Sequence, residues 1–325
     1  MVSFEIVDGD DIDYEMFASL QREAYKELLS NLKVSNNFMT PMFYRWKFHP
    51  PAGTAKIAIV KKGERLISTN AMIPVKLQMG KYKIQGWQAT DAATLKTERR
   101  KGYSSRCLQL FTQILKTNEI IFVFPNKSSA PYAEKLGFHS KGVITTWVKP
   151  AILLNKKVSE NVIRVTKFGK EQDVLAEKLV DTNKVIISRV ADYLNWRYVD
   201  HPIYKYTLFV YRDAKEQQGY GVVRKLEAIG HTIAVVMELW GLQPKIKIEL
   251  LRSITAWAIE QGIKKIVLQE NSQSLLSGLK AGFIAVPHWI LPKKQILMAH
   301  AAPGELSEKF IRSKWRIQTG DWDGL

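Results

Sequence analysis

Cysteine is nearly absent from this sequence. The only one among the 325 residues is Cys107, so the chain can form no internal disulfide and no Cys-rich zinc site. The six histidines show no short ligand spacing, and the longest apolar runs, such as residues 120–124, are far shorter than the ~20 residues that cross a bilayer. The sequence therefore argues against redox, haem, structural-metal and membrane-spanning proteins.

Two common nucleotide-binding motifs and a secretion signal are also missing. The sequence contains no Gly-Lys-Ser/Thr of a Walker loop and no Gly-x-Gly-x-x-Gly of a Rossmann fingerprint. The first eight residues have neither a basic start nor an apolar core, so they do not resemble a signal peptide. We therefore expect a cytoplasmic protein that uses neither of these nucleotide-binding modes.

The composition is that of a globular protein with a large excess of basic residues. Apolar residues make up 46% and charged residues 24%, and the length corresponds to two domains of ~150 residues. The 48 Lys and Arg against 31 Asp and Glu give a net charge of +17, which both halves of the chain share. Such an excess suggests an anionic ligand such as a phosphate, a nucleic acid or a membrane headgroup. A solvated basic surface is the alternative.

A tandem repeat organises the chain. Residues 46–50 (WKFHP) are echoed by residues 196–202 (WRYVDHP), and both are followed by β-forming sequence. Asn126 and Asn271 each stand eleven residues before the Gly of a Lys-x-Gly-Phe motif. A repeat of this kind predicts two homologous domains. We expect them at residues 1–150 and 151–325, joined near residues 149–157.

The two halves show the same order of predicted elements. In the first half the pattern of apolar residues predicts a helix at 13–32, strands at 83–91, 120–124 and 143–148, a helix with apolar positions 107, 108, 111, 114 and 115, and a short helix at 128–136. The second half should contain strands at 234–239 and 265–269 and helices at 247–259 and 272–281. The predicted fold class is mixed α/β in both halves.

The segment 94–105 has the features of a phosphate-binding loop. Such a site needs converging backbone N–H groups, a residue without Cβ and the positive end of a helix. Gly102 supplies the close approach, and Ser104 and Ser105 can lie in the first helical turn. Arg99, Arg100 and Lys101 add positive charge. A basic turn before a helix is the alternative interpretation.

The motif Arg99-x-x-Gly102-x-Ser104 resembles the Arg/Gln-x-x-Gly-x-Gly/Ala signature of the GNAT superfamily of acyl-CoA-dependent N-acyltransferases, with Ser in place of Gly or Ala. A second family feature, Asn followed by Gly-Phe, is matched by Asn126 and Gly137-Phe138. The resemblance covers most of residues 1–150. It implies two tandem GNAT-like domains, each a mostly antiparallel sheet flanked by helices.

The resemblance also implies a site for acetyl-CoA as the acyl donor, without a metal. The donor would lie in a split between the fourth and fifth strands. The residues implied to hold its pyrophosphate are Lys101, Gly102, Tyr103, Ser104 and Ser105, with Arg99 and Arg100 in the same loop. Those implied along the pantetheine and thioester are Ala92, Ala93 and Thr94. Asn126 belongs to the implied cofactor site, although its repetition as Asn271 favours a role in the fold equally.

Two residues are candidates for proton transfer. Asp91 is the one carboxylate near the strand bulge that the family has, and it would act as the base; the alternative is an ion pair with a nearby Lys or Arg. The family places its catalytic Tyr where this chain has Ala133, and Tyr132 lies one residue earlier, a step of ~100° around a helix. Either Tyr132 reaches the thiolate through a local distortion, or solvent or another donor protonates the thiolate, or the domain binds CoA without efficient transfer. We rank the second of these first.

The second half provides an internal control. Residues 241–247 have no Gly at the junction of loop and helix, and Pro244 removes one amide, so this half is expected not to bind CoA. His49 and His201 occur in both halves, which favours a structural role for His49. The C-terminal residues 315–325 are expected to dock, either by packing of their two tryptophans or with Asp321 or Asp323 touching the substrate amine.

The leading hypothesis is an acetyl-CoA-dependent N-acetyltransferase that acts on an amine acceptor. The acceptor is left open among amino sugars, sugar nucleotides, small amines and protein lysines. Because a basic cleft favours phosphorylated or acidic acceptors, amino-sugar nucleotides are placed slightly ahead. One alternative is a Fem-type transferase that uses aminoacyl-tRNA, which the charge would suit. Another is a non-catalytic protein that binds CoA or another anion. The oligomeric state is left open.

Overall fold

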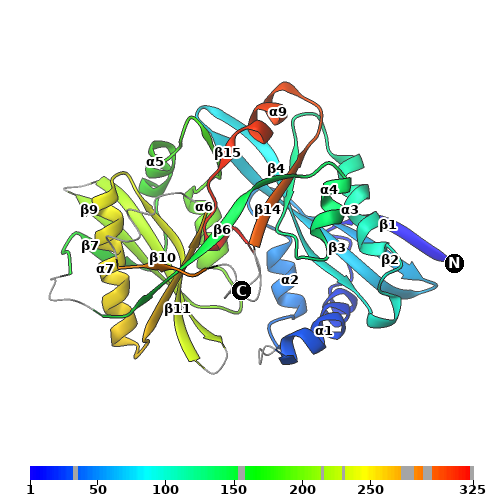
Figure 1. Cartoon of the computed structure of the whole chain (residues 1–325), viewed down its shortest axis with the longest axis horizontal. Helices are drawn as coiled ribbons and strands as arrows, with labels where there is room; N and C mark the ends of the chain where they lie inside the picture. Colours follow the sequence, from blue (N-terminus) through cyan, green and yellow to red (C-terminus); the bar gives the residue numbers. More distant parts are fainter. Residues whose placement is uncertain are drawn as a thin grey trace. The chain divides into compact units, whose positions relative to one another are not determined.

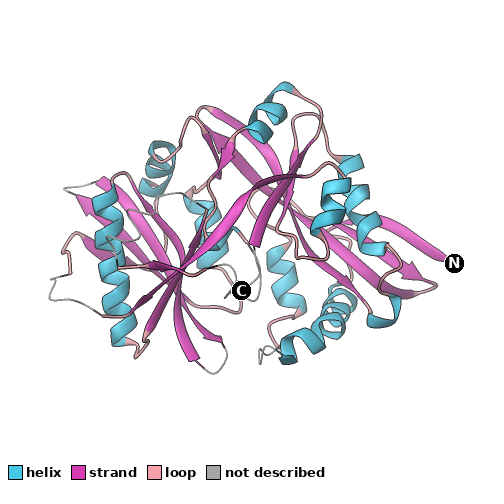
Figure 2. Ribbon diagram, viewed as in Figure 1, coloured by secondary structure: helices cyan, strands magenta, loops and turns pink. Residues whose placement is uncertain are grey.

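The computed structural model describes residues 1–31, 36–152, 158–213, 216–228, 231–271, 282–287 and 295–322 (Figure 1). Its contacts divide the chain into two units. The first comprises Met1–Gly142 and Gln295–Lys314, and the second comprises Val143–Lys294 and Trp315–Leu325. Each unit is a mainly antiparallel sheet flanked by helices (Figure 2), which confirms the predicted α/β class.

The first unit is built on strands that pair in sequence order. Its elements are β1 (Val2–Asp8), α1 (Tyr14–Asn31), α2 (Pro41–Lys47), β2 (Lys56–Lys62), β3 (Arg65–Met79), β4 (Tyr82–Thr94), η1 (Lys96–Glu98), α3 (Tyr103–Ile114), β5 (Ile120–Val123), α4 (Ala130–Lys135), β14 (Gln295–Ala301) and α9 (Glu305–Arg312). Strands β1 to β4 are antiparallel, and β5 is parallel to β4. This order places the carboxyl ends of β4 and β5 at the same edge of the sheet.

Local sequence signals explain where the helices of this unit begin. The carboxylate of Asp13 accepts hydrogen bonds from the backbone N–H groups of Glu15 (2.9 Å) and Met16 (3.0 Å), so it caps α1. Thr40 caps α2 by accepting from the N–H of Phe43, and a proline follows at the first helical position. Helix α3 buries Cys107, Leu108 and Phe111 as the periodicity predicted.

The second unit repeats this order. Its elements are β7 (Val162–Val165), α5 (Glu171–Lys178), β8 (Lys184–Ile187), α6 (Ala191–Tyr198), β9 (Tyr206–Asp213), β10 (Glu216–Ala228), β11 (His231–Gly241), α7 (Pro244–Glu260), β12 (Lys265–Glu270), β13 (Ile284–Ala285) and η2 (Thr319–Asp321). Strands β7, β9, β10 and β11 are antiparallel in succession, and β12 is parallel to β11. Helix α7, yellow in Figure 1, packs on this sheet through Ile246, Leu250 and Ile254. The structure thus contains the repeat that the sequence motifs predicted.

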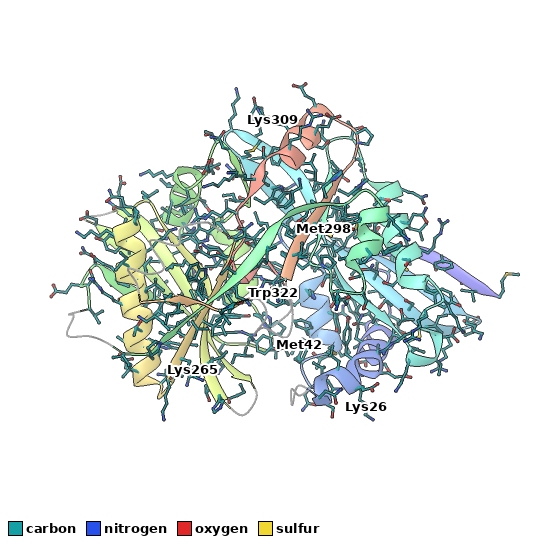
Figure 3. The ribbon with its side chains drawn as sticks, viewed as in Figure 1. Lys26, Met42, Lys265, Met298, Lys309 and Trp322 are labelled. Carbon is teal, nitrogen blue, oxygen red and sulfur yellow. The ribbon has the colours of Figure 1, made fainter. Side chains whose placement is uncertain are left out.

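In each unit, the strand beside the parallel pair comes from the other half of the sequence. In the first unit β14 pairs antiparallel with β5, and Met298 of β14 is buried there opposite Val123 (Figure 3). In the second unit the end of β6 (His139–Pro150) pairs antiparallel with β12, from Thr145 to Pro150. Strand β6 therefore begins in one unit and ends in the other, as does the short β15 (Lys314–Trp315).

Some sequence predictions fall on residues that the structure does not describe. These are the end of the first helix at Leu32, the polar residues Asn155, Lys156 and Lys157, and the helix expected at 272–281. Within the described ranges, no helix is both long and apolar enough to cross a membrane.

Candidate functional site

A bulge interrupts strand β4 near its carboxyl end. Thr69 of β3 pairs with Ala93 and Ala71 pairs with Thr90, so the two residues Asp91 and Ala92 lie opposite a single residue of β3. Asp91 has a positive φ of 52°, which is uncommon for a residue with a side chain. A bulge bends the strand and turns its backbone groups out of the ladder. The structure therefore contains the bulge beside which Asp91 was expected.

Side chains of α1 hold the bulge. Gln21 Nε2 donates a hydrogen bond to the carbonyl oxygen of Asp91 (2.9 Å), and the Tyr25 hydroxyl donates to the carbonyl oxygen of Ala92 (2.8 Å). Burial raises the pKa of Tyr25 to about 12, and the negative charge of Asp91 acts in the same direction. The phenol is thus a neutral donor at physiological pH, and it fixes the bulge backbone from the helix side.

The carboxylate of Asp91 forms an ion pair with Lys47. Lys47 Nζ lies 2.8 Å from Asp91 Oδ2 and 3.0 Å from Oδ1, and the side chain of Lys47 is only 3% exposed. Taking a proton from a substrate amine would neutralise the carboxylate and leave the lysine charge buried without its partner. The geometry therefore favours the ion-pair interpretation of Asp91 over the general-base interpretation.

Strands β4 and β5 part just before the bulge. Their parallel ladder runs from Gly86 with Ile120 to Ala89 with Val123 and ends there, whereas β4 continues to Thr94 in its ladder with β3. The three residues predicted to line the donor follow this parting point. Ala92 is exposed, Ala93 is buried, and the Thr94 hydroxyl lies 2.7 Å from the hydroxyl of Ser68.

Helix α3 begins at the loop that the sequence singled out. Gly102 is the N-cap residue, with φ 80°, and no atom lies within 4 Å of the place where a Cβ would stand. No side chain caps the helix, and the first i to i+4 hydrogen bond runs from the N–H of Arg106 to the carbonyl of Gly102. The preceding amides of Tyr103, Ser104 and Ser105 therefore have no acceptor within the helix. Together with the helix dipole, they form an uncapped terminus of the kind that suits an anion.

The basic side chains of this loop are placed differently from one another. Arg99 donates to the carbonyl oxygens of Thr94 (3.2 Å) and Ala24 (2.6 Å), so it fastens the loop to β4 and α1. Lys101 Nζ lies 2.7 Å from Glu98 Oε2, and this hydrogen bond is the main cause that lowers the pKa of Glu98. Arg100 is exposed and has φ 65°. The backbone amides at the start of α3 are therefore better placed to bind an anion than the side chains of Arg99 and Lys101, which already have partners.

Tyr132 lies beside the first turn of α3. Burial raises the pKa of its phenol, and the side chain of Ser105 acts in the opposite direction. Ala133, the residue at the family's tyrosine position, is buried. On the short helix α4, Tyr132 therefore faces the predicted cofactor loop, and the one-residue offset does not turn it into the core.

Two polar residues shared by the repeat have roles in the fold. Asn126 Oδ1 accepts from the N–H groups of Ser128 (2.9 Å) and Ser129 (3.0 Å), which arranges the turn before α4. His49 Nδ1 lies 2.6 Å from the carbonyl oxygen of Arg45, and its Nε2 lies 2.8 Å from Asp10. The side chains of Asn126 and His49 thus bond to nearby backbone groups or, for His49, also to Asp10. A structural role was expected for His49.

The second unit has no counterpart of this loop. Residues 95–101 separate the end of β4 from the N-cap Gly102, whereas Leu242 alone separates the end of β11 at Gly241 from the N-cap of α7, Gln243. Strand β11 carries a similar bulge at Met237, and its ladder with β12 ends at Val236 with Leu268. The second unit thus retains the parting of the two parallel strands, but it lacks the long loop before the helix that could hold a phosphate.

The C-terminal segment fills the split of the second unit. Gln318 accepts from the N–H of Leu239 (2.7 Å) and donates to its carbonyl oxygen (2.9 Å), while the Thr319 hydroxyl bonds both backbone groups of Gln269 (2.9 and 3.2 Å). Gln318 and Thr319 are fully buried. Sequence reasoning identified a docking tail but missed this role, because no local motif shows which strand a polar residue will bond.

Asp321 of the C-terminal segment is not placed to contact a substrate. Asp321 is buried in an ion pair with Arg189, which also contacts the buried Glu238 at 3.1 Å. Trp315 is buried, and the side chain of Trp322, which is labelled in Figure 3, donates through Nε1 to Gln269 Oε1 at 3.1 Å. For Asp321, the structure therefore favours the packing interpretation of the tail. Asp323 lies outside the described residues.

Residues 9–140, which include the site just described, match the acetyltransferase (GNAT) domain family. This confirms the resemblance found in the sequence and the class of GNAT-type N-acyltransferases. No curated protein matches the sequence.

Solved structures show that the similarity extends along the whole chain. A GCN5-related N-acetyltransferase from Anabaena variabilis ATCC 29413 has a TM-score of 0.66 at 11% identity over 91% of this chain and 72% of its own. A probable N-acyltransferase from Enterococcus faecalis V583 has a TM-score of 0.65 at 13% identity, covering 92% and 72%. A tandem GNAT protein from the clavulanic acid biosynthesis pathway has a TM-score of 0.57 at 13% identity, covering 92% and 98%. The chain thus has the fold of tandem GNAT proteins.

Proposed function

We propose that the first unit binds acetyl-CoA and transfers its acetyl group to an amine. The observation that carries this proposal is the combination at one sheet edge of a bulged β4, its parting from β5 and the uncapped N-terminus of α3 at Gly102. The thioester of the donor supplies an activated acyl group. The second unit, whose split is filled by Gln318 and Thr319, binds no donor.

The residues present fit the pyrophosphate of the donor. The amides of Tyr103, Ser104 and Ser105 lack intrahelical acceptors, and Gly102 leaves open space before them. Its φ of 80° also explains why glycine stands there, since a side chain disfavours that backbone conformation. The hydroxyls of Ser104 and Ser105 add donors on the same turn.

Tyr132 is assigned as the proton donor. It lies on the short helix α4 near Ser105, and its raised pKa keeps the phenol protonated at physiological pH. Asp91 and Lys47 are assigned to the structure of the bulge, because their ion pair is buried. Water is therefore assigned as the acceptor of the amine proton.

The acceptor that the chain favours is an amino sugar or a sugar nucleotide. A net charge of +17 attracts anionic substrates and repels polyamines and basic peptides. Salt should weaken the acceptor's apparent affinity for the same reason. A free amino sugar and its anionic nucleotide-linked form therefore make an informative pair.

The experiment is a thiol-release assay with acetyl-CoA and a panel of amines. The panel contains amino-sugar nucleotides, free amino sugars, polyamines and a lysine peptide. The protein's own thiol should not interfere, because burial raises the pKa of Cys107 to about 12. Acceptor-dependent release by the wild type and not by Gly102→Glu supports the proposal. Acetyl-CoA binding without release for any amine would support the non-catalytic alternative.

A further inference from the structure

A buried guanidinium in the second unit has hydrogen-bond donors without acceptors. Nε and Nη2 of Arg316 are inaccessible to solvent and have no hydrogen-bond partner among the described residues. The Arg316 guanidinium carbon lies 3.8 Å from the ring centroid of Trp240, so the group is held in place by stacking. Burial of charged donors without acceptors is unfavourable, which suggests that an anion completes this site.

A second unpartnered group lies nearby. The hydroxyl of Tyr220 is buried and has no hydrogen-bond partner within the described part of the chain. Tyr220 of β10 stands directly opposite Trp240 of β11, and directly paired residues point to the same face of a sheet. Burial raises the pKa of Tyr220, so the phenol is a neutral donor.

Lys247, in the first turns of α7, adds a second cation. It forms no ion pair with a described residue, and burial lowers its pKa to about 8, with the charge of Arg316 acting in the same direction. Glu270 opposes this effect, and Lys184 adds to it. Lys184 is itself paired with Asp181 at 3.3 Å.

The charge of Glu270 acts on both Arg316 and Lys247, but among the described residues no hydrogen bond or ion pair joins it to the unpartnered donors of Arg316 or to Lys247. The two deeply buried carboxylates near this cluster, Glu238 and Asp321, are both bonded to Arg189. Helix α7 also directs its N-terminus toward this end of β11, and Gln243 provides no side-chain cap. Two cations, an unpartnered hydroxyl and a helix terminus match the charge and donors of a phosphate dianion better than those of a carboxylate.

We propose that Arg316, Lys247 and Tyr220 of the second unit bind a phosphate group. The cradle and the open split of a CoA site are both missing here, because the loop is short and Gln318 occupies the split. The ligand is therefore inorganic phosphate or the terminal phosphate of a molecule whose remainder stays outside the split. This inference does not depend on the activity of the first unit.

The test measures the affinity of inorganic phosphate for the full chain by calorimetry. It is made in the Gly102→Glu background, so that the first unit's helix terminus cannot contribute. Phosphate should bind, and Lys247→Met and Arg316→Met should each weaken it about tenfold or more. Lys245→Met, which removes the same charge from an exposed position in the same helical turn, should weaken it less than about threefold.

The pKa of Lys247 provides a second test. Phosphate binding should shift this pKa, whereas a purely structural role of Lys247 predicts no shift. After reductive methylation, its NMR resonance should titrate near pH 8 without phosphate and at higher pH with it. Adenosine monophosphate distinguishes the sources, because tighter binding than inorganic phosphate indicates a larger ligand and equal binding indicates the free ion. Absence of phosphate binding, or equal binding by wild type, Lys247→Met and Arg316→Met, overturns the proposal.

Discussion

The side-chain amide of Gln318 bonds both backbone groups of Leu239, with its oxygen 2.7 Å from the N–H and its nitrogen 2.9 Å from the carbonyl. It thereby satisfies the backbone hydrogen-bonding groups of β11 beyond the point at which β11 parts from β12. In the first unit, the corresponding parting of β4 from β5 lies beside the uncapped terminus of α3. One chain thus contains a split filled by its own tail and a split suited to an external ligand.

Gln318→Leu should destabilise the second unit. The substitution leaves the N–H and carbonyl of Leu239 buried without partners, which costs about 2–4 kcal/mol in the free energy of unfolding. Urea unfolding measures this, with Gln113→Leu on an exposed position of α3 as the control. A change below about 0.5 kcal/mol, the range of ordinary surface substitutions, would argue against a structural plug.

Asp91→Asn should lower the free energy of unfolding and leave the pH dependence of the reaction nearly unchanged. It leaves the buried Lys47 without its counter-charge, at a cost of about 3 kcal/mol. The exposed Asp11→Asn is the matched control. If Asp91 were the base, the variant would instead remove the acidic limb of the kcat/KM profile while leaving the unfolding free energy unchanged.

Tyr132→Phe should lower kcat by about 10- to 100-fold and leave the KM for acetyl-CoA nearly unchanged. The wild-type kcat should also fall as the pH rises through the phenol's raised pKa, because the deprotonated phenol cannot donate. This alkaline limb should be absent in the variant. Tyr82→Phe, at the far end of β4, is the control, and equal effects of the two substitutions would contradict the assignment.

Glu98→Gln should tighten acetyl-CoA binding by about two- to fivefold. The substitution releases Lys101 from its ion pair beside the cradle and raises the local positive charge. Glu64→Gln, an exposed change of the same charge in the first unit, should have a smaller effect. Weaker binding by Glu98→Gln would mean that the ion pair is needed to shape the loop.

The sequence predicted the elements and the loop well because both depend on local patterns. The apolar spacing at Cys107, Leu108 and Phe111 marked α3, and Gly102 marked its start. The exchange of β14 and β6 between the two units was not predictable, because a strand's sequence indicates one buried face and not its partner. The Lys47 to Asp91 ion pair joins residues 44 positions apart, so it also required the fold.

Calorimetric titration with acetyl-CoA tests the central claim, that the chain has one donor site and that it lies at Gly102. The wild type should bind one molecule per chain, Gly102→Glu should bind none, and Gly63→Glu should bind like the wild type. Gly63 also has a positive φ and open space around it, so it controls for backbone strain. Two molecules per chain, or binding retained by Gly102→Glu, would contradict the account. No binding by the wild type would remove the acetyltransferase function and leave aminoacyl-tRNA as the donor to test.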